Sequence, residues 1–321
     1  MAARGATGAA DSACDALSAL PAGAKEVRSC AGKDAAAAVK QSSPGTPMLL
    51  RGALETWPAR RAWALDALAA RFGDACVRVG LRPGGRPETM RLADFAAYAR
   101  RGADGDEDPR YVFEPRLRPP LTEEYDPTVG GVFPDDLFGL LGEATRPPYR
   151  WLCLGPRRSG SRPHIDPLAS SAWNALLSGR KRWALIDPSA VGGGPRGSAL
   201  SREDVVAGSL PPARWFSERL PLLRAKCPQG VSEAIQEAGD VMCVPAGVWH
   251  AVLNLTDTVA ITQNYVGPAE FDRAWCAVRA ERPGLAKEWL RLLRAHRPEL
   301  ARRAEALGGP AGAALLGQRL A

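Results

Sequence analysis

Six short apolar segments, each bounded by glycine, proline or polar turn residues, restrict the fold more than any other feature of the chain. They cover residues 151–154, 172–177, 181–186, 241–244, 251–255 and 259–265. Segments of about four to eight residues are short for buried helices and are typical of strands. We therefore predict a mainly β protein with flanking helices, in which antiparallel strands close into a barrel-like core.

The rest of the chain divides by composition around this core. Residues 1–45 are rich in Ala, Gly and Ser without an apolar period, which predicts a disordered lead. For residues 46–110 we predict a flank of short helices and strands. We expect the core to span residues 111–268, with a Gly-, Pro- and Arg-rich insertion at 187–238. For residues 269–321 we predict C-terminal helices.

Composition excludes several classes of protein. The 321 residues, 45% of them hydrophobic, are enough for a self-sufficient core. Seven cysteines without a Cys-x-x-Cys pair argue against a disulfide scaffold or a thiolate zinc site, and they indicate a reducing compartment, the nucleus or the cytoplasm. No stretch approaches the roughly 18 uncharged apolar residues of a membrane span. The net charge of +7 would suit an acidic partner such as nucleic acid without requiring one.

A metal site is indicated by two of the three histidines. His164 and Asp166 are two residues apart, so in a strand both side chains project from one face and can reach one ion. His250 follows a Pro-x-Gly turn and begins a strand, which would aim it into the barrel. Two imidazoles and one carboxylate form the facial triad of non-haem Fe(II) oxygenases, so we assign these three residues as metal ligands and catalytic residues.

Lys181 is the candidate partner of an anion. On its predicted strand it shares a face with Trp183 and Leu185, so its ammonium would point into an enclosed space. A dicarboxylate co-substrate bound to the metal would supply the counter-charge. The alternative is a lysine that reaches solvent beside Arg180 and Arg182.

These motifs resemble those of the JmjC Fe(II)/2-oxoglutarate oxygenases of the cupin superfamily. Residues 239–254 match the second cupin motif, G-x5-P-x-G-x2-H-x3-N, at every specified position. Segments 155–183 and 239–265 are more narrowly similar to the branch of bifunctional arginine demethylases and lysyl-hydroxylases. The likeness extends from about residue 47 to about residue 300.

The resemblance implies a double-stranded β-helix (jelly roll, cupin-like) core that uses Fe(II), 2-oxoglutarate and O2. It implies that His164, Asp166 and His250 bind iron and that Lys181 pairs with the distal carboxylate of 2-oxoglutarate. The remaining contacts to the co-substrate and near the metal would come from polar side chains, namely Tyr111, Ser161, Asn174, Thr262 and Asn264.

The resemblance also implies an oxidoreductase, a dioxygenase that hydroxylates a carbon of a protein side chain. A Lys carbon is the favoured target, and hydroxylation of an N-methyl carbon of Arg would end in demethylation. The partner would be a protein or peptide with a basic segment, which acidic residues before the core could attract, namely Glu114, Glu123, Glu124, Asp126, Asp135 and Asp136.

Other interpretations remain open at this point. One is an RNA-directed 2-oxoglutarate oxygenase, and another is a catalytically inactive metal-binding cupin scaffold. The C-terminal helices could form a homodimer or only cap the barrel.

Overall fold

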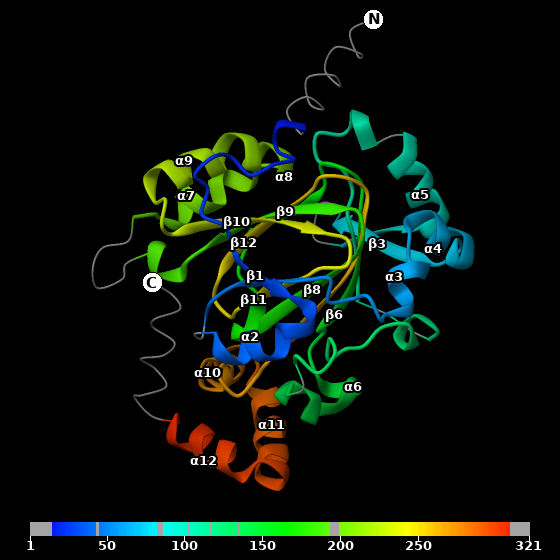
Figure 1. The fold of residues 1–321 in the computed structure, drawn as a ribbon. Helices are drawn as coiled ribbons and strands as arrows, with labels where there is room; N and C mark the ends of the chain where they lie inside the picture. The colour runs from blue at the N-terminus through cyan, green and yellow to red at the C-terminus, as the bar shows by residue number, and fades with distance from the viewer. Residues whose placement is uncertain are drawn as a thin grey trace, which may run out of the picture.

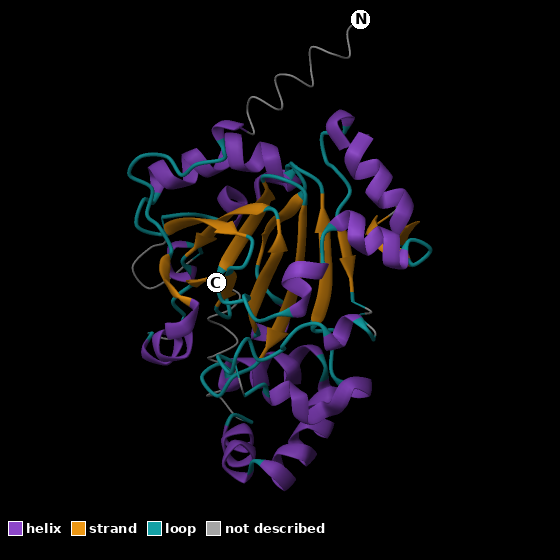
Figure 2. Cartoon of the chain, turned by 45° about the vertical axis from the view of Figure 1, so that its right-hand side comes forward, coloured by secondary structure: helices purple, strands orange, loops and turns teal. Residues whose placement is uncertain are grey.

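The computed structural model describes residues 15–308 except 43–44, 82–85, 102, 116, 118, 134 and 193–198. Two β-sheets packed face to face form its centre, and helices surround them (Figures 1 and 2). No helix among these residues combines the length and the apolar character needed to cross a bilayer.

The larger sheet has seven strands. Their order is β1 (Arg28–Ala31), β2 (Met48–Arg51), β11 (Val241–Val244), β8 (Ser171–Ser178), β13 (Thr258–Tyr265), β6 (Arg150–Gly155) and β5 (Val112–Glu114). The smaller sheet has four, in the order β10 (Val231–Glu237), β9 (Arg180–Ile186), β12 (Trp249–Asn254) and β7 (Gly160–His164). Every pair is antiparallel except β1 with β2.

The chain passes from one sheet to the other at nearly every connection from β6 to β13. This winding is that of a double-stranded β-helix, so the predicted fold class is confirmed. Strand alternation then sorts the side chains. On β8, Trp173, Ala175 and Leu177 face the outer hydrophobic core, whereas Asn174 and Leu176 face the space between the sheets.

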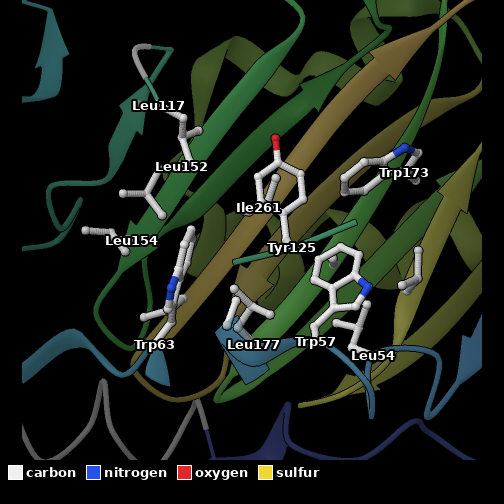
Figure 3. Close-up of a cluster of buried hydrophobic side chains, with 14 of the residues drawn as sticks. Leu54, Trp57, Trp63, Leu117, Tyr125, Leu152, Leu154, Trp173, Leu177 and Ile261 are labelled. Carbon is white, nitrogen blue, oxygen red and sulfur yellow. The ribbon is translucent and has the colours of Figure 1, made fainter. Parts of the chain in front are cut away.

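The N-terminal flank covers the outer face of the larger sheet. It consists of α3 (Pro58–Ala62), α4 (Leu65–Phe72), the hairpin β3 (Cys76–Leu81) and β4 (Pro87–Arg91), and α5 (Leu92–Arg101). Trp57 packs against Tyr125 and Trp173, with ring centroids 5.5 Å and 6.2 Å apart. Figure 3 shows these rings beside Trp63 and Leu177. This cluster fixes β8, which carries inward-facing polar residues on its other side.

The insertion at 187–238 covers the smaller sheet and is largely structured. It contains α7 (Arg202–Val206), α8 (Pro212–Arg214), α9 (Leu220–Lys226) and the strand β10, which the sequence analysis did not predict. Trp215 and Phe216 pack against Ala184 and Ala251 on the outer face of β9 and β12.

The predicted C-terminal helices are α10 (Phe271–Glu281), α11 (Pro283–His296) and α12 (Pro298–Ala306). They pack around Trp275 and Trp289 with the 3-10 helix η4 (Leu137–Leu141) and α6 (Gly142–Thr145) nearby, at the bottom of Figure 1. The Trp289 indole donates a hydrogen bond to the carbonyl of Leu137 at 3.1 Å. Their apolar faces are therefore used within the chain, and a homodimer through them stays a prediction.

The structure differs from the expected disordered lead at residues 15–42. Residues 1–14 lie outside the described residues, but β1 pairs with β2, and α2 (Ala35–Gln41) follows. Just before β1, the Val27 amide donates to the Glu233 carbonyl, and the Glu233 amide donates to the Lys25 carbonyl, both at 2.9 Å. Backbone hydrogen bonds at the sheet edges hold this segment in place. Such bonds do not require a regular pattern of apolar residues, so the sequence gives little sign of them.

A buried cluster of ion pairs lies next to this segment, around Glu233 of β10. The Glu233 carboxylate, 1% exposed, accepts bonds from Arg182 at 2.5 Å and Arg224 at 2.7 Å. We expect Glu233→Gln to lower the free energy of unfolding by about 3 kcal/mol, because Arg182 would remain buried without a counter-charge. Denaturant unfolding measures this. Glu237→Gln breaks the exposed Arg180 pair on the same two strands and should change stability by less than about 1 kcal/mol. Equal effects of both substitutions would contradict the expectation.

Candidate metal centre

The three predicted metal ligands converge at one end of the smaller sheet. His164 ends β7 and lies opposite His250 on β12, and Asp166 follows β7 by two residues. Their candidate ligand atoms all lie within 4.8 Å of one another. The imidazole centroids are 4.1 Å apart, and His250 Nε2 lies 4.0 Å from Asp166 Oδ2.

Hydrogen bonds orient both imidazoles toward this shared point. Nδ1 of His164 lies 2.8 Å from the Arg162 carbonyl, and Nδ1 of His250 lies 3.0 Å from the Val248 carbonyl. A carbonyl only accepts, so in the neutral ring Nδ1 carries the proton and Nε2 keeps a free lone pair. Burial, followed by the neighbouring His164, lowers the pKa of His250 to about 4, so this ring is neutral at pH 7.

Asp166 completes the donor set. Its Oδ2 is buried and has no hydrogen-bond partner among the described residues. A buried carboxylate oxygen without a partner is costly, and a divalent cation would satisfy it together with both Nε2 atoms. Two nitrogen donors and one carboxylate oxygen suit a first-row divalent metal such as Fe(II). The residues present therefore fit a metal ion of this kind.

A β-bulge brings Ser161 to the metal side. His250 lies opposite His164 and Val252 lies opposite Ser161, so Arg162 and Pro163 share the place opposite one residue of β12. Without the bulge, alternation would turn Ser161 away from the face of His164. The adjacent Gly160 is needed here, because a Cβ at this position would lie 2.0 Å from the Val252 carbonyl oxygen.

Lys181 lies on the interior face of β9, as predicted, and is 1% exposed. No carboxylate among the residues that the structure describes pairs with it, and its nearest aromatic contact is the Tyr111 ring, 5.9 Å from Nζ. Burial lowers the pKa of Lys181 to about 8. A buried ammonium without a counter-ion fits an anionic ligand, whereas the alternative of a solvent-exposed lysine does not hold.

The larger sheet contributes the other predicted polar residues. Asn174 and Thr262 lie opposite each other on β8 and β13. The Asn174 Oδ1 is buried without a partner among the described residues, and the Thr262 hydroxyl donates to the Trp173 carbonyl at 3.0 Å. Asn264 donates to Ser170 Oγ at 3.0 Å, which anchors the turn that follows Asp166.

Tyr111 lies just before β5 and packs against the interior cluster of Trp151 and Cys153. Burial raises the pKa of Tyr111 well above its usual value, with a further contribution from the Cys153 thiol. Its hydroxyl is therefore neutral at pH 7 and able to donate. The structure thus brings every predicted site residue to the space between the sheets or to its rim.

One interior network was missed by the sequence analysis. Gln236 on β10 is fully buried, accepts from Trp183 Nε1 at 2.7 Å, and donates to the carbonyls of Asn174 at 2.8 Å and Asp240 at 3.1 Å. It ties the two sheets together behind the site. The apolar residues of Val231–Glu237 do not alternate with polar ones, so the sequence contains no clear strand signal that could have revealed it.

From the sequence, six acidic residues before the core were expected to attract a basic substrate. Four of the six are instead buried or bound to groups within the chain. Glu124 binds Arg71 and Trp63, Asp126 caps the turn at Thr128, and Asp136 caps η4. Glu114 is buried. Only Glu123 and Asp135 of this group are exposed, because the other carboxylates bind groups within the chain.

Comparisons with known proteins confirm the resemblance noted in the sequence. The family model of the cupin-like domain matches residues 36–271. The chain is similar to the arginine-specific demethylase JMJ22 of Arabidopsis thaliana, with 40% identity over 240 residues, 70% of this chain and 43% of that protein.

It is also similar to the bifunctional arginine demethylase and lysyl-hydroxylase psr-1 of Caenorhabditis elegans, with 32% identity over 272 residues, 80% of this chain and 64% of the relative. The 2-oxoglutarate and iron-dependent oxygenase JMJD4 of Homo sapiens is 28% identical over 276 residues, 77% of this chain and 63% of the relative. The chain thus spans less than two thirds of the length of each of these relatives.

The matched residues 36–271 make up most of the chain and include the metal centre, Lys181 and every strand of the two sheets except β1. The chain therefore belongs to the cupin-like domain family.

Proposed function

We propose that this protein is an Fe(II)- and 2-oxoglutarate-dependent dioxygenase that hydroxylates a protein side chain. The convergence of His164, Asp166 and His250, with free donor atoms aimed at one point, carries this proposal. The unpaired Lys181 in the same interior supports an anionic co-substrate, because a buried cation needs a counter-charge. Relatives named as iron- and 2-oxoglutarate-dependent oxygenases agree with both.

One group of residues would bind the metal, and another group would bind the co-substrate. Nε2 of both imidazoles and a carboxylate oxygen of Asp166 would hold the ion on one face, which leaves the opposite face open. Lys181 would pair with the distal carboxylate of 2-oxoglutarate. Hydrogen bonds from Tyr111, Ser161, Asn174 and Thr262 would orient the co-substrate, and Asn264 would keep the Asp166 turn in place.

Iron in this centre, when bound, supplies the O2-dependent oxidation in which 2-oxoglutarate becomes succinate and CO2 while a substrate C–H bond is hydroxylated. The protein contributes a largely apolar interior next to the ligands, lined by Trp183, Leu185 and Val252. Such a lining keeps water from the reacting groups and strengthens the Lys181 interaction with a carboxylate.

The substrate would be a Lys side chain, with methylated Arg as the second target, in a basic and flexible protein segment. The names of psr-1 and JMJ22 support this class of substrate, since they describe lysyl hydroxylation and arginine demethylation. The acids 114–136 do not provide a continuous acidic rim, so recognition would depend on local contacts at the mouth of the barrel.

The test is turnover of a peptide library by the iron-loaded protein. The protein would be purified without oxygen, supplied with Fe(II), 2-oxoglutarate and O2, and assayed for succinate and for peptide mass. We expect succinate together with the gain of one oxygen on Lys peptides. Metal binding without succinate would identify an inactive scaffold, and oxygen gained only by RNA would identify an RNA-directed enzyme. Either result contradicts the proposal.

A further inference from the structure

Lys181 has two cross-strand neighbours on its face of the smaller sheet, and only one of them has an unused polar atom. Gln236 on β10 and Asn254 on β12 both lie directly opposite Lys181. Side chains of directly opposite residues project from the same face of the sheet. The Gln236 amide is already bonded to Trp183, Asn174 and Asp240. The Asn254 Oδ1 is buried without a partner among the described residues.

A hydrogen bond to Ser159 fixes the orientation of the Asn254 side-chain amide. The Ser159 hydroxyl donates to the Pro156 carbonyl at 2.5 Å, so toward Asn254 it can only accept, and Nδ2 donates to it at 2.9 Å. Two backbone bonds of 2.9 Å, Asn254 N to the Ser159 carbonyl and Arg158 N to the Asn254 carbonyl, hold the same loop. Because Nδ2 faces Ser159, Oδ1 is the amide atom left for another partner.

Gly155 has no side chain, and this leaves room for Asn254, Ser159 and Tyr111 to lie close together. A Cβ at Gly155 would lie 2.3 Å from Asn254 Nδ2, 2.4 Å from Ser159 Oγ and 2.6 Å from Tyr111 Cδ2. The Asn254 amide and the Tyr111 ring therefore border the same small volume. The Lys181 ammonium lies over the same Tyr111 ring, 5.9 Å from its centroid, so the three side chains lie in one part of the interior.

We propose that Asn254 is the positioning residue for Lys181, and that its Oδ1 supplies the hydrogen-bond acceptor that the ammonium lacks. Held in this way, Lys181 presents its charge to the distal carboxylate of the co-substrate. That second part rests on the proposed function, whereas the pairing of Asn254 with Lys181 does not. Asn254 is not expected to touch the reacting atoms.

The charges around Lys181 give the pairing a measurable signature. The titratable groups that face it are Tyr111 and Cys153, and burial raises the pKa of both, so both are neutral at pH 7. An acceptor beside an ammonium favours its charged form. Removing the acceptor should therefore lower the pKa of Lys181, and a carboxylate at position 254 should raise it.

The first experiment uses protein without metal or co-substrate. The free energy of unfolding is measured between pH 6 and pH 10.5 for the parent chain, Asn254→Leu and Asn254→Asp, and the same curve for Lys181→Met is subtracted from each. The unfolded chain binds the Lys181 proton more tightly than the folded one, so stability in the difference curve rises with pH between about 8 and 10.5. We expect this rise to begin at lower pH in Asn254→Leu and to shrink in Asn254→Asp.

The matched control is Gln263→Leu. Gln263 is also buried with an unpartnered amide oxygen, but it lies on the opposite face of β13 from Thr262 and Asn264. It should leave the pH dependence unchanged, even where overall stability changes. If both leucine variants leave the alkaline rise where the parent has it, the positioning role is wrong.

The second experiment measures 2-oxoglutarate binding by calorimetry to protein loaded with Mn(II). Asn254→Leu should bind about tenfold more weakly at pH 7.5, the effect of losing one hydrogen bond to a charged group. A shifted alkaline rise without 2-oxoglutarate binding in the parent would retain the pairing and reject the proposed function. Unchanged affinity together with an unshifted rise would reject the pairing and leave the proposed function intact.

Discussion

Replacing His250 with alanine should lower 2-oxoglutarate-dependent succinate formation by at least about a thousandfold, a loss typical of a residue on which the whole catalytic unit depends. The imidazole supplies one of only three donors that converge at this centre, and no other His, Cys, Asp or Glu among the described residues joins that group. The iron content after anaerobic loading should fall with the activity. Succinate assays and elemental analysis of the same preparation measure the two effects.

His296→Ala is the control for this substitution. His296 is exposed in the last turn of α11 and takes no part in the centre, so its variant should keep both iron and activity. Circular dichroism should show that His250→Ala remains folded, because Trp183 and the surrounding strands keep their own packing. Full turnover by His250→Ala would remove the triad assignment.

Replacing Lys181 with methionine should change stability and co-substrate binding in opposite directions. A pKa lowered from 10.5 to about 8 in the folded chain means that burying the charged amine costs about 3 kcal/mol at pH 7, at about 1.4 kcal/mol for each pKa unit. Methionine fills a similar volume without the charge, so the protein without cofactors should become more stable by roughly that amount. The affinity for 2-oxoglutarate should fall by about 3 to 5 kcal/mol, because its distal carboxylate loses its partner.

The pH dependence distinguishes this explanation from simple repacking. Below about pH 8 Lys181 is charged in both the folded and the unfolded chain, so the full penalty is present and the gain from methionine is greatest. As the pH rises toward 10.5 the folded chain has already released the proton, and the gain disappears. Urea unfolding at pH 7 and pH 10.5 measures the difference. Lys287→Met, on an exposed position of α11, should show no such trend, and a gain in Lys181→Met that is equal at both pH values would contradict the account.

The metal centre was predictable because its residues obey local rules. Few histidines are present, His164 and Asp166 have strand spacing, and the Pro-x-Gly turn before His250 fixes where the strand begins. The interior position of Lys181 followed from alternation with Trp183 and Leu185. Those rules depend on neighbouring residues only, so a single sequence contains them.

Other parts of the site depend on registers between distant strands and could not be predicted from the sequence. The bulge that turns Ser161 inward exists only in the pairing of β7 with β12. Asn254 matched the cupin motif, but its relation to Lys181 appears only once β12 lies beside β9. The acidic residues between 114 and 136 were expected to form an exposed acidic surface. The sequence does not show that Arg71, Arg146 and Trp63 bind some of them.

The N-terminal segment has a practical consequence for preparing shortened versions of this protein. Residues 25–31 lie along β10 and then β2, so they cover an edge strand of each sheet. A recombinant version trimmed to the family match at residues 36–271 would lose this cover and expose two hydrogen-bonding edges at once. Such a protein would tend to associate edge to edge, and an oligomer observed with it would reflect the truncation, not the natural assembly.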